Sequence, residues 1–183
     1  MAKKIGAIVS LVIIGALIVA TIIMANININ YSVPCATPND IYVQMGSGTP
    51  ERVTNADMKK KIVNYINDAS QENSLTALFN GNIGNYAKVV SKKGTFSTTA
   101  STFYVRFTYN DVQTLKEGDS KFVDSDGKTY SYDDLVFAIS DTDGETEVMV
   151  YVIPDDADSK RYSHYYTVDA DFSDLYSYLD SNF

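Results

Sequence analysis

An uninterrupted run of apolar and small residues from Ile5 to Ala25 is the feature that most constrains this chain. Lys3 and Lys4 come directly before the run. A helix of about 20 such residues crosses the roughly 30 Å hydrocarbon layer of a membrane. Because lysines beside such a helix stay in the cytoplasm, residues 1–25 are expected to form a cytoplasmic tip and a transmembrane signal anchor. The N-terminus is then cytoplasmic, and the rest of the chain lies outside the cytoplasm.

Two other interpretations of this segment are less favoured. A cleavable signal peptide has a shorter apolar core, and cleavage after Ala25 would place Ile23 where a small residue is preferred. A lipid-anchored cysteine is the second alternative, but Pro34 precedes Cys35 where bacterial lipoprotein signals have a glycine or alanine. An uncleaved anchor is therefore the interpretation that we carry forward.

The remaining residues predict one domain on a short stalk. Residues 26–39 are rich in asparagine and contain Pro34 and Pro38, as expected for a stalk. Residues 40–183 have the commonest length of a single domain and can bury a core. Cys35 is the only cysteine, so no disulfide can form within the chain and packing must provide its stability.

Charge is distributed unevenly along the chain. Residues 51–110 carry eight basic and four acidic residues, whereas residues 111–183 carry five basic and eighteen acidic residues. The acidic half disfavours binding to nucleic acid and favours cations or a basic partner, or else it is an ordinary soluble surface. The run Lys59 to Lys61 could meet an anionic polymer, although a solvated helix face explains it equally well.

Patterning predicts an α+β domain, with two or three helices on one face of an antiparallel sheet. Apolar residues at helical spacing from Met58 to Ala69 predict a helix that Thr54 caps, and a second helix could follow through Leu75 and Leu78. The C-terminal segment Asp171 to Leu179 predicts a helix behind an aspartate cap. The expected strands are 40–45, 102–109, 122–123 with 128–132, 135–139, 148–153 as the central strand, and 162–168.

Two Asp-x-Asp-Gly segments resemble fragments of calcium-binding loops. They are Asp124 to Gly127 and Asp141 to Gly144, and each glycine can adopt the positive φ that a hairpin turn requires. With each glycine at the sixth position of a calcium loop, Phe122 or Ile139 falls at the first position, and neither can bind the ion. Both segments are interpreted as hairpin turns.

Catalytic chemistry is weakly indicated. Gly46 and Gly48 precede a helix, but Glu51 stands where a dinucleotide-binding loop needs glycine or alanine. His164 is the only histidine, and it alternates with tyrosines in an expected strand, as a packed or surface residue does. Paired carboxylates of a glycosidase could come only from residues such as Asp133 and Asp134, or Asp169 and Asp171. No catalytic, cofactor-binding or metal-binding residue is predicted.

Tyrosine is abundant, at 14 of 183 residues, and eight of these lie between residues 130 and 178. An exposed cluster of these rings would favour contact with peptide, glycan or protein, whereas buried rings would complete a modest core.

We therefore expect a membrane-anchored, noncatalytic interaction or assembly module that contacts membrane lipid through its anchor and a protein or cell-envelope partner through its domain. The alternative is an extracytoplasmic hydrolase of cell-wall or glycan material. Neither nucleic acid nor a cofactor is expected, and the sequence leaves the oligomeric state open. The eight tyrosines between residues 130 and 178 are Tyr130, Tyr132, Tyr151, Tyr162, Tyr165, Tyr166, Tyr176 and Tyr178.

Overall fold

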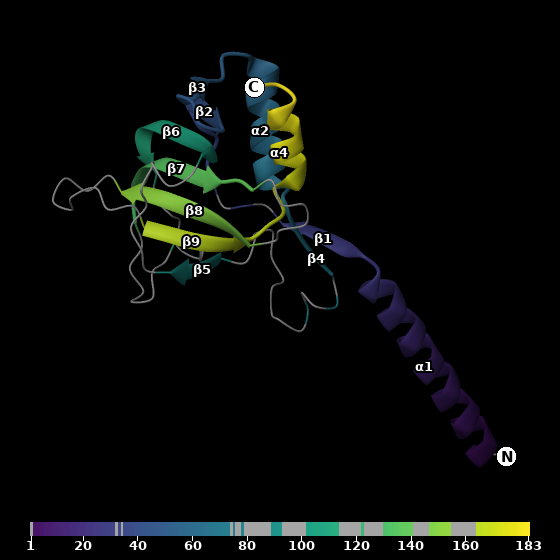
Figure 1. Cartoon of the computed structure of the whole chain (residues 1–183). Helices are drawn as coiled ribbons and strands as arrows, with labels where there is room; N and C mark the ends of the chain where they lie inside the picture. The colour runs from purple at the N-terminus through teal and green to yellow at the C-terminus, as the bar shows by residue number, and fades with distance from the viewer. Residues whose placement is uncertain are drawn as a thin grey trace.

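The chain forms an α+β domain from which a long N-terminal helix projects (Figure 1). A computed structural model describes residues 2–31, 33, 35–73, 75, 78, 89–92, 102–113, 122, 130–140, 147–154 and 164–183. The α+β class predicted from the sequence is confirmed. Most of the expected second helix around Leu75 lies outside the described residues, and so do both Asp-Gly turns.

Seven described strands form one sheet in the order β3-β2-β6-β7-β8-β9-β5, and every neighbouring pair is antiparallel. A separate two-stranded ribbon pairs β1 with β4. The strands are β1 (Asn28–Tyr31), β2 (Asp40–Met45), β3 (Glu51–Arg52), β4 (Ser70–Asn73), β5 (Val89–Lys92), β6 (Phe103–Gln113), β7 (Tyr132–Ala138), β8 (Glu147–Pro154) and β9 (His164–Asp169).

The expected strands are largely present, with two corrections. The strand expected to end at Tyr109 continues to Gln113 as β6, and the strand expected from Leu135 begins three residues earlier, at Tyr132, as β7. Of the separate strand expected at 128–132, the described residues Tyr130 and Ser131 are not in a strand. The middle of the seven strands is β7, not the strand from Val148 that was expected to be central. That strand, β8, is interior, so its apolar character reflects pairing on both sides rather than the central position.

Helices α2 (Ala56–Asn67) and α4 (Ser173–Asp180) contact each other beside the same face of the sheet (Figure 1). Their apolar stripes supply Ile62, Ile66, Leu175 and Leu179, all of which are buried. These side chains join one core with alternate residues of the strands, among them Val105, Phe107, Val150 and Val152. The expectation that helices pack on one sheet face is confirmed for α2 and α4.

Asn55, rather than the expected Thr54, caps α2. Asn55 has an extended backbone (φ −75°, ψ 124°), and its side-chain Oδ1 accepts hydrogen bonds from the backbone N–H groups of Asp57 and Met58. These bonds satisfy two donors that the first helical turn leaves without a partner. Both residue types cap helices well, so the sequence pattern alone misplaced the cap by one residue.

α4 begins without a side-chain hydrogen bond from its N-cap residue, Phe172. The predicted aspartate acts one residue earlier, because Asp171 Oδ1 accepts from the backbone N–H of Ser173 at 2.9 Å. Phe172 is free to point inward and packs in the core against Phe137, with ring centroids 6.1 Å apart. The start of α4 therefore combines a core anchor with a neighbouring polar cap.

The segment expected to be a stalk makes extensive contacts with the domain. β1 pairs with β4, and Val33 is buried, with its N–H donating to the carbonyl oxygen of Asn67. Cys35 is half-buried, and its Sγ lies 3.3 Å from Asn67 Oδ1. Tyr109 donates from its hydroxyl to the carbonyl oxygen of Ala36 at 2.8 Å. Val33, Cys35 and Ala36 are therefore packed against the domain.

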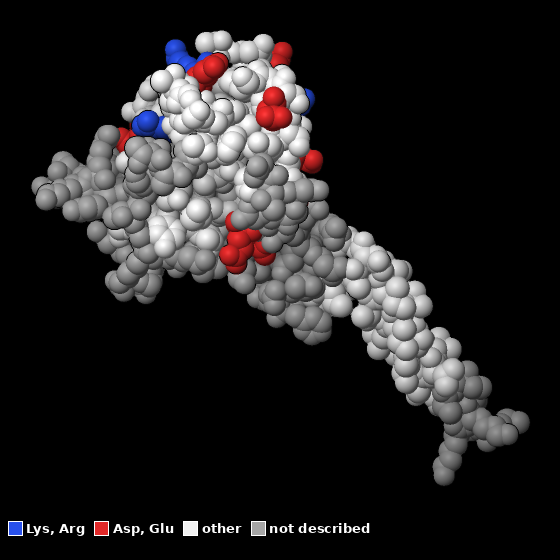
Figure 2. All heavy atoms as spheres, in the orientation of Figure 1, with Lys and Arg blue, Asp and Glu red and all other residues white. Residues whose placement is uncertain are grey.

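α1 (Ala2–Ala25) projects from the β1–β4 ribbon, away from the sheet (Figure 1). Its described surface carries no acidic or basic side chain (Figure 2), and large apolar side chains from Val9 to Ile23 are about half exposed or more. Asn26 ends the helix, since its side-chain amide donates to the carbonyl oxygen of Ile22. Among the described residues, no helix meets the length and hydropathy criteria of a membrane span.

Candidate functional site

Two surfaces of the domain bring chemically distinctive side chains together. The first is the sheet face turned away from α2 and α4, which we call the tyrosine face. Strand alternation places its residues opposite to those of the core, because successive side chains of a strand point to opposite sides. We define the tyrosine face by Tyr42, Tyr104, Arg106, Asp134, Val136, Met149, Tyr151 and Tyr165.

A cross-strand row forms the centre of the tyrosine face. Val136 lies opposite Arg106 on one side and Tyr151 on the other, and Tyr151 lies opposite Tyr165. The rings of Tyr151 and Tyr165 are 6.1 Å apart between centroids. Tyr104, Val136 and Tyr151 are buried in a small second cluster, so this part of the face is packed rather than open.

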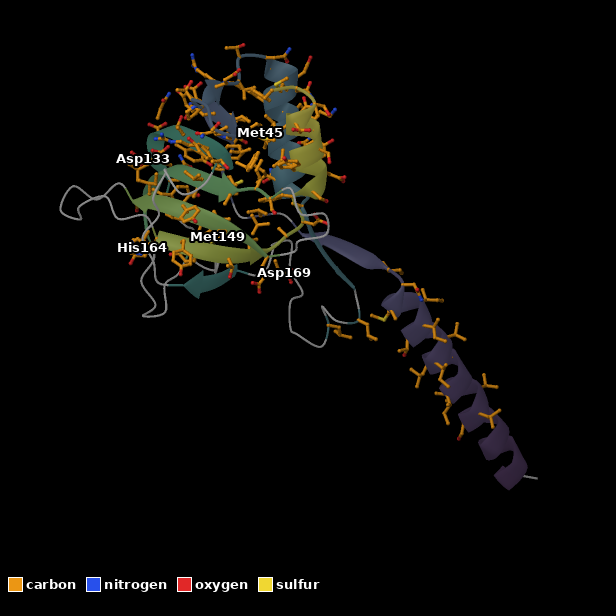
Figure 3. All side chains as sticks on the ribbon, in the orientation of Figure 1. Met45, Asp133, Met149, His164 and Asp169 are labelled. Carbon is orange, nitrogen blue, oxygen red and sulfur yellow. The ribbon has the colours of Figure 1, made fainter. Side chains whose placement is uncertain are left out.

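Met149 gives the tyrosine face an exposed apolar point. Its side chain lies on β8 (Figure 3), and the residue is 43% exposed. The Tyr151 hydroxyl lies 3.6 Å from its sulfur. Ile153 and Tyr165 are partly buried beside the same cluster. Methionine fills irregular gaps and adapts to different partners, so this part of the sheet can contact an apolar surface.

Arg106 and Asp134 form the charged part of the tyrosine face. Asp134 lies on the same side as Val136 because the two are separated by one residue in a regular part of β7. The register irregularity before Asp134 leaves Tyr132 in the main core on the opposite side. The guanidinium of Arg106 donates to both carboxylate oxygens. The hydrogen bond to Asp134 raises the pKa of Arg106 further above its ordinary value. The pair neutralises a nearly buried carboxylate and leaves it no evident role as a catalytic acid.

The second surface is a cavity of about 350 Å³ between α2 and α4, which we call the α2–α4 cavity. The residues that line the cavity on the α2 side recur at helical spacing. Those on the α4 side lie in the first turn of α4 or just before that helix. Ala69 and Leu175 are buried, so they contribute little open surface to the cavity. The lining residues are Lys61, Asn64, Tyr65, Asp68, Ala69, Asp171, Ser173, Asp174 and Leu175.

Carboxylates outnumber basic groups around the α2–α4 cavity. Asp68, Asp171 and Asp174 line it, whereas Lys61 is the one basic residue among the described residues of the lining. The ammonium group of Lys61 lies over the ring of Tyr178, 4.4 Å from its centroid. That contact is a cation–π interaction, so the ammonium has a partner other than the three carboxylates.

The run Lys59 to Lys61 is divided among different contacts. Lys59 donates from Nζ to the carbonyl oxygen of Asn39 and to Asp40 Oδ1. Arg52 donates to the same oxygen, and this hydrogen bond is the main cause of the lowered pKa of Asp40. Lys59 therefore links the start of β2 to α2, which makes a common anion-binding role for the three lysines less favourable.

The predicted candidates for hydrolysis do not converge on one point. Asp133 and His164 lie at one end of the sheet, and Asp169 lies at the other (Figure 3). His164 stacks on Tyr130 with ring centroids 3.9 Å apart, which agrees with the packed strand residue expected. Asp171 accepts a backbone hydrogen bond at the start of α4, and its side chain lines the α2–α4 cavity.

Metal binding can be assessed only over part of the chain. Asp124, Asp126, Asp141 and Asp143 lie outside the described residues. Within the described ranges, no three histidine, cysteine or carboxylate side chains come close enough together to hold a metal ion. Gly46 adopts a positive φ of 85° at the end of β2, where it turns the chain toward β3. Its conformation explains a glycine at this position without a nucleotide.

Sequence reasoning missed both surfaces as sites. Lys61 was interpreted as part of a solvated helix face, and the spacing of three and four residues from Lys61 to Asn64 and Asp68 was the available signal. Arg106 alternates with the core residues Val105 and Phe107 of β6, but its partner Asp134 could be found only once β6 and β7 were placed in register.

No protein-family model matches this chain, and neither the curated proteins nor the solved structures compared with it are significantly similar.

Proposed function

We propose that this chain is a single-pass membrane protein that holds its α+β domain outside the cytoplasm as a noncatalytic interaction or assembly module. The exposed apolar surface of α1 carries the proposal. Its large side chains would be costly to leave in water, at about 25 cal/mol for each Å² of apolar surface. They are Val9, Leu11, Val12, Ile13, Ile14, Leu17, Ile18, Val19, Ile22 and Ile23.

The dimensions of α1 suit this role. Its 24 residues would extend about 36 Å at about 1.5 Å per residue, compared with roughly 30 Å for the hydrocarbon layer. The apolar length is taken from the sequence, in which the run begins at Ile5. Lys3 and Lys4 before the run favour a cytoplasmic N-terminus.

The tyrosine face is the proposed interaction surface. Its accessible part combines the exposed Met149 with the partly buried rings of Tyr42 and Tyr165, and methionine and tyrosine are both enriched at protein interfaces. Arg106 and Asp134 neutralise each other, so apolar and hydrogen-bonding contacts would dominate recognition. A protein or another component of the cell envelope is the kind of partner that such a surface fits.

Topology can be tested with intact cells that lack an outer barrier. Protease added outside should release the domain, while a cytoplasmic control protein remains whole. The membrane fraction should retain a fragment that contains α1. Protection of the domain, or a mature chain that begins at Asn26, would contradict the proposed anchor.

The interaction surface can be tested with a photo-crosslinking amino acid placed at Met149. The matched control is the same amino acid at Asp57, an exposed position on α2 away from the sheet. We expect a discrete crosslinked product in cells from position 149 and not from position 57. Equal products from both positions, or from neither, would contradict a partner on the tyrosine face.

The alternative function is hydrolysis of cell-wall or glycan material. One observation favours it, namely the carboxylates of Asp68, Asp171 and Asp174 around a single cavity. If it is correct, the purified full chain should release soluble fragments from cell-wall material, and Asp174→Asn should abolish the release. Fragment release that requires Asp174 would replace the noncatalytic proposal.

A further inference from the structure

The β1–β4 ribbon returns the chain to the end of α1. β1 begins at Asn28, three residues after α1 ends at Ala25, and its register pairs Asn28 with Asn73, the last residue of β4. Paired residues of an antiparallel ribbon lie about 4.5 to 5.5 Å apart between Cα atoms. The two strands run side by side to the end of the ribbon where α1 is attached (Figure 1). The chain that follows Asn73 therefore starts close to the C-terminal end of α1.

Apolar side chains on both sides of the ribbon are exposed. Ile27, between α1 and β1, is 50% exposed, and Leu78, five residues after β4, is 49% exposed. The backbone N–H of Ile27 donates to the carbonyl oxygen of Met24, so Ile27 stays against the last turn of α1. Leu75 is half-buried, and its spacing of three residues from Leu78 would place both side chains on one face of a helix. These residues would meet a bilayer at the level where α1 leaves it.

The sequence that follows the ribbon lacks charge. Residues 73–87 contain no aspartate, glutamate, lysine or arginine, although such residues make up 21% of the chain. Apolar and aromatic residues recur within the same run, at Leu75, Leu78, Phe79, Ile83 and Tyr86. Such a sequence can enter the boundary between headgroups and acyl chains without desolvating a charge, and tyrosine is enriched at that boundary. The composition therefore agrees with the place to which the ribbon leads.

The bilayer is the partner that α1 itself brings to this place. If α1 spans the membrane, it holds Leu75 within about 20 Å of the lipid, because only short extended segments separate the two. Contact with lipid is then an intramolecular event with a high effective concentration. A protein partner would instead have to be recruited in a separate binding step. The exposed leucine therefore fits lipid better than a second protein.

We propose that Leu75 and Leu78 form a second membrane contact, seated in the interfacial layer of the bilayer beside the end of α1 and held there by the β1–β4 ribbon. This contact rests on the proposed membrane anchor and adds a second point of attachment to it. Val33 follows the ribbon, is buried, and donates to the carbonyl oxygen of Asn67, which ties the ribbon to the domain. Two attachments and a tied ribbon would hold the domain in one orientation to the bilayer.

Tryptophan fluorescence can measure the contact, because the chain contains no tryptophan. The full chain is reconstituted into phosphatidylcholine vesicles, with or without lipid brominated in the upper part of its acyl chains, which quenches any tryptophan that it touches. Leu78→Trp and Leu75→Trp report on the proposed contact. Ile22→Trp, on the exposed surface of α1, reports on the anchor. Asp57→Trp, at an exposed position in the first turn of α2, is the matched control.

We expect brominated lipid to quench Leu78→Trp and Leu75→Trp by about twofold or more, because an interfacial side chain reaches about 5 to 10 Å into the boundary of the acyl chains. Ile22→Trp should be quenched at least as strongly. Asp57→Trp should keep its emission, since Asp57 lies about 15 Å along α2 from Asn67, the residue that Val33 contacts beside the ribbon.

Each other outcome would overturn the second contact. Quenching of Ile22→Trp alone would do so and leave the anchor standing, whereas absence of quenching in Ile22→Trp would overturn the anchor as well. Blue-shifted emission of Leu78→Trp without quenching would show that protein covers this position. Equal quenching of Asp57→Trp and Leu78→Trp would show unspecific adsorption of the domain. Loss of the circular dichroism of the sheet in both leucine variants would assign Leu75 and Leu78 to folding instead.

Discussion

Arg106 and Asp134 form a two-point ion pair between β6 and β7, with Nε to Oδ1 at 2.7 Å and Nη2 to Oδ2 at 2.9 Å. They are diagonal neighbours, because Arg106 lies opposite Val136 and Asp134 lies opposite Thr108. The carboxylate side chain is 8% exposed and the arginine side chain 40% exposed. This geometry fixes a planar guanidinium at two points, so it specifies strand register as well as charge.

Asp134→Asn should destabilise the folded chain by about 1 to 3 kcal/mol, because one charged hydrogen bond is weakened and Arg106 loses its counter-charge. Denaturant unfolding in detergent micelles measures the change. Asp111→Asn, at an exposed position of β6, is the control and should stay within about 0.5 kcal/mol of the parent. Equal effects of the two variants would argue against a structural role of the pair.

The thiol of Cys35 should react slowly in the folded chain. Burial raises its pKa from 9.0 to about 12, and Sγ lies beside Asn67 Oδ1. The thiolate is the reactive form, so a thiol reagent at about pH 8 should modify the native chain far more slowly than the chain in denaturant. Cys35 is the only cysteine, so the signal is unambiguous. Equally fast modification of both forms would refute this prediction.

The same thiol makes a pH-dependent contribution to stability. The folded state holds the proton more tightly than the unfolded state, because the pKa is higher in the folded chain. Its contribution is complete below about pH 9 and is lost as the pH rises toward about 12. The parent should therefore lose more stability than Cys35→Ala over this interval, as measured by denaturant midpoints. Parallel pH curves would contradict the assignment.

Asn55→Ala should destabilise the chain by about 0.5 to 2 kcal/mol, since Asp57 and Met58 each lose a hydrogen-bond acceptor at the start of α2. Asn55→Asp should retain most of the stability, because aspartate accepts the same bonds. Thr54→Ala tests the residue that the sequence favoured as the cap and should have little effect. Thermal unfolding that ranks Thr54→Ala as the more damaging variant would restore the original prediction.

Local patterns predicted the elements whose boundaries depend on local chemistry. β2 was predicted at its observed limits because Gly46 ends it with a positive φ. The stripe of α2 was recognised because Ile62 and Ile66 recur at helical spacing. Its cap was misplaced because Thr54 and Asn55 have similar chemistry, and only the backbone conformation distinguishes them.

Elements that depend on distant partners could not be predicted. β3 is two polar residues, Glu51 and Arg52, and it is a strand only because β2 lies beside it. β1 reads as a polar stalk until β4 pairs with it. The same limit applied to the tyrosine face, because the contact of Arg106 with Asp134 depends on the register between β6 and β7. The α2–α4 cavity joins residues about 100 positions apart, which no local pattern connects.

The C-terminal helix is the last element whose role can be tested directly. Leu175 is 1% exposed and packs in the main core, as the apolar stripe of this segment predicted. Leu175→Ala should cost about 2 to 5 kcal/mol, since it removes buried apolar surface and leaves a cavity. Ser177→Ala, at an exposed position of the same helix, should be nearly neutral and controls for helix propensity. Thermal unfolding of the full chain decides the question, because an unchanged midpoint in Leu175→Ala would mean that α4 is not part of the cooperative core.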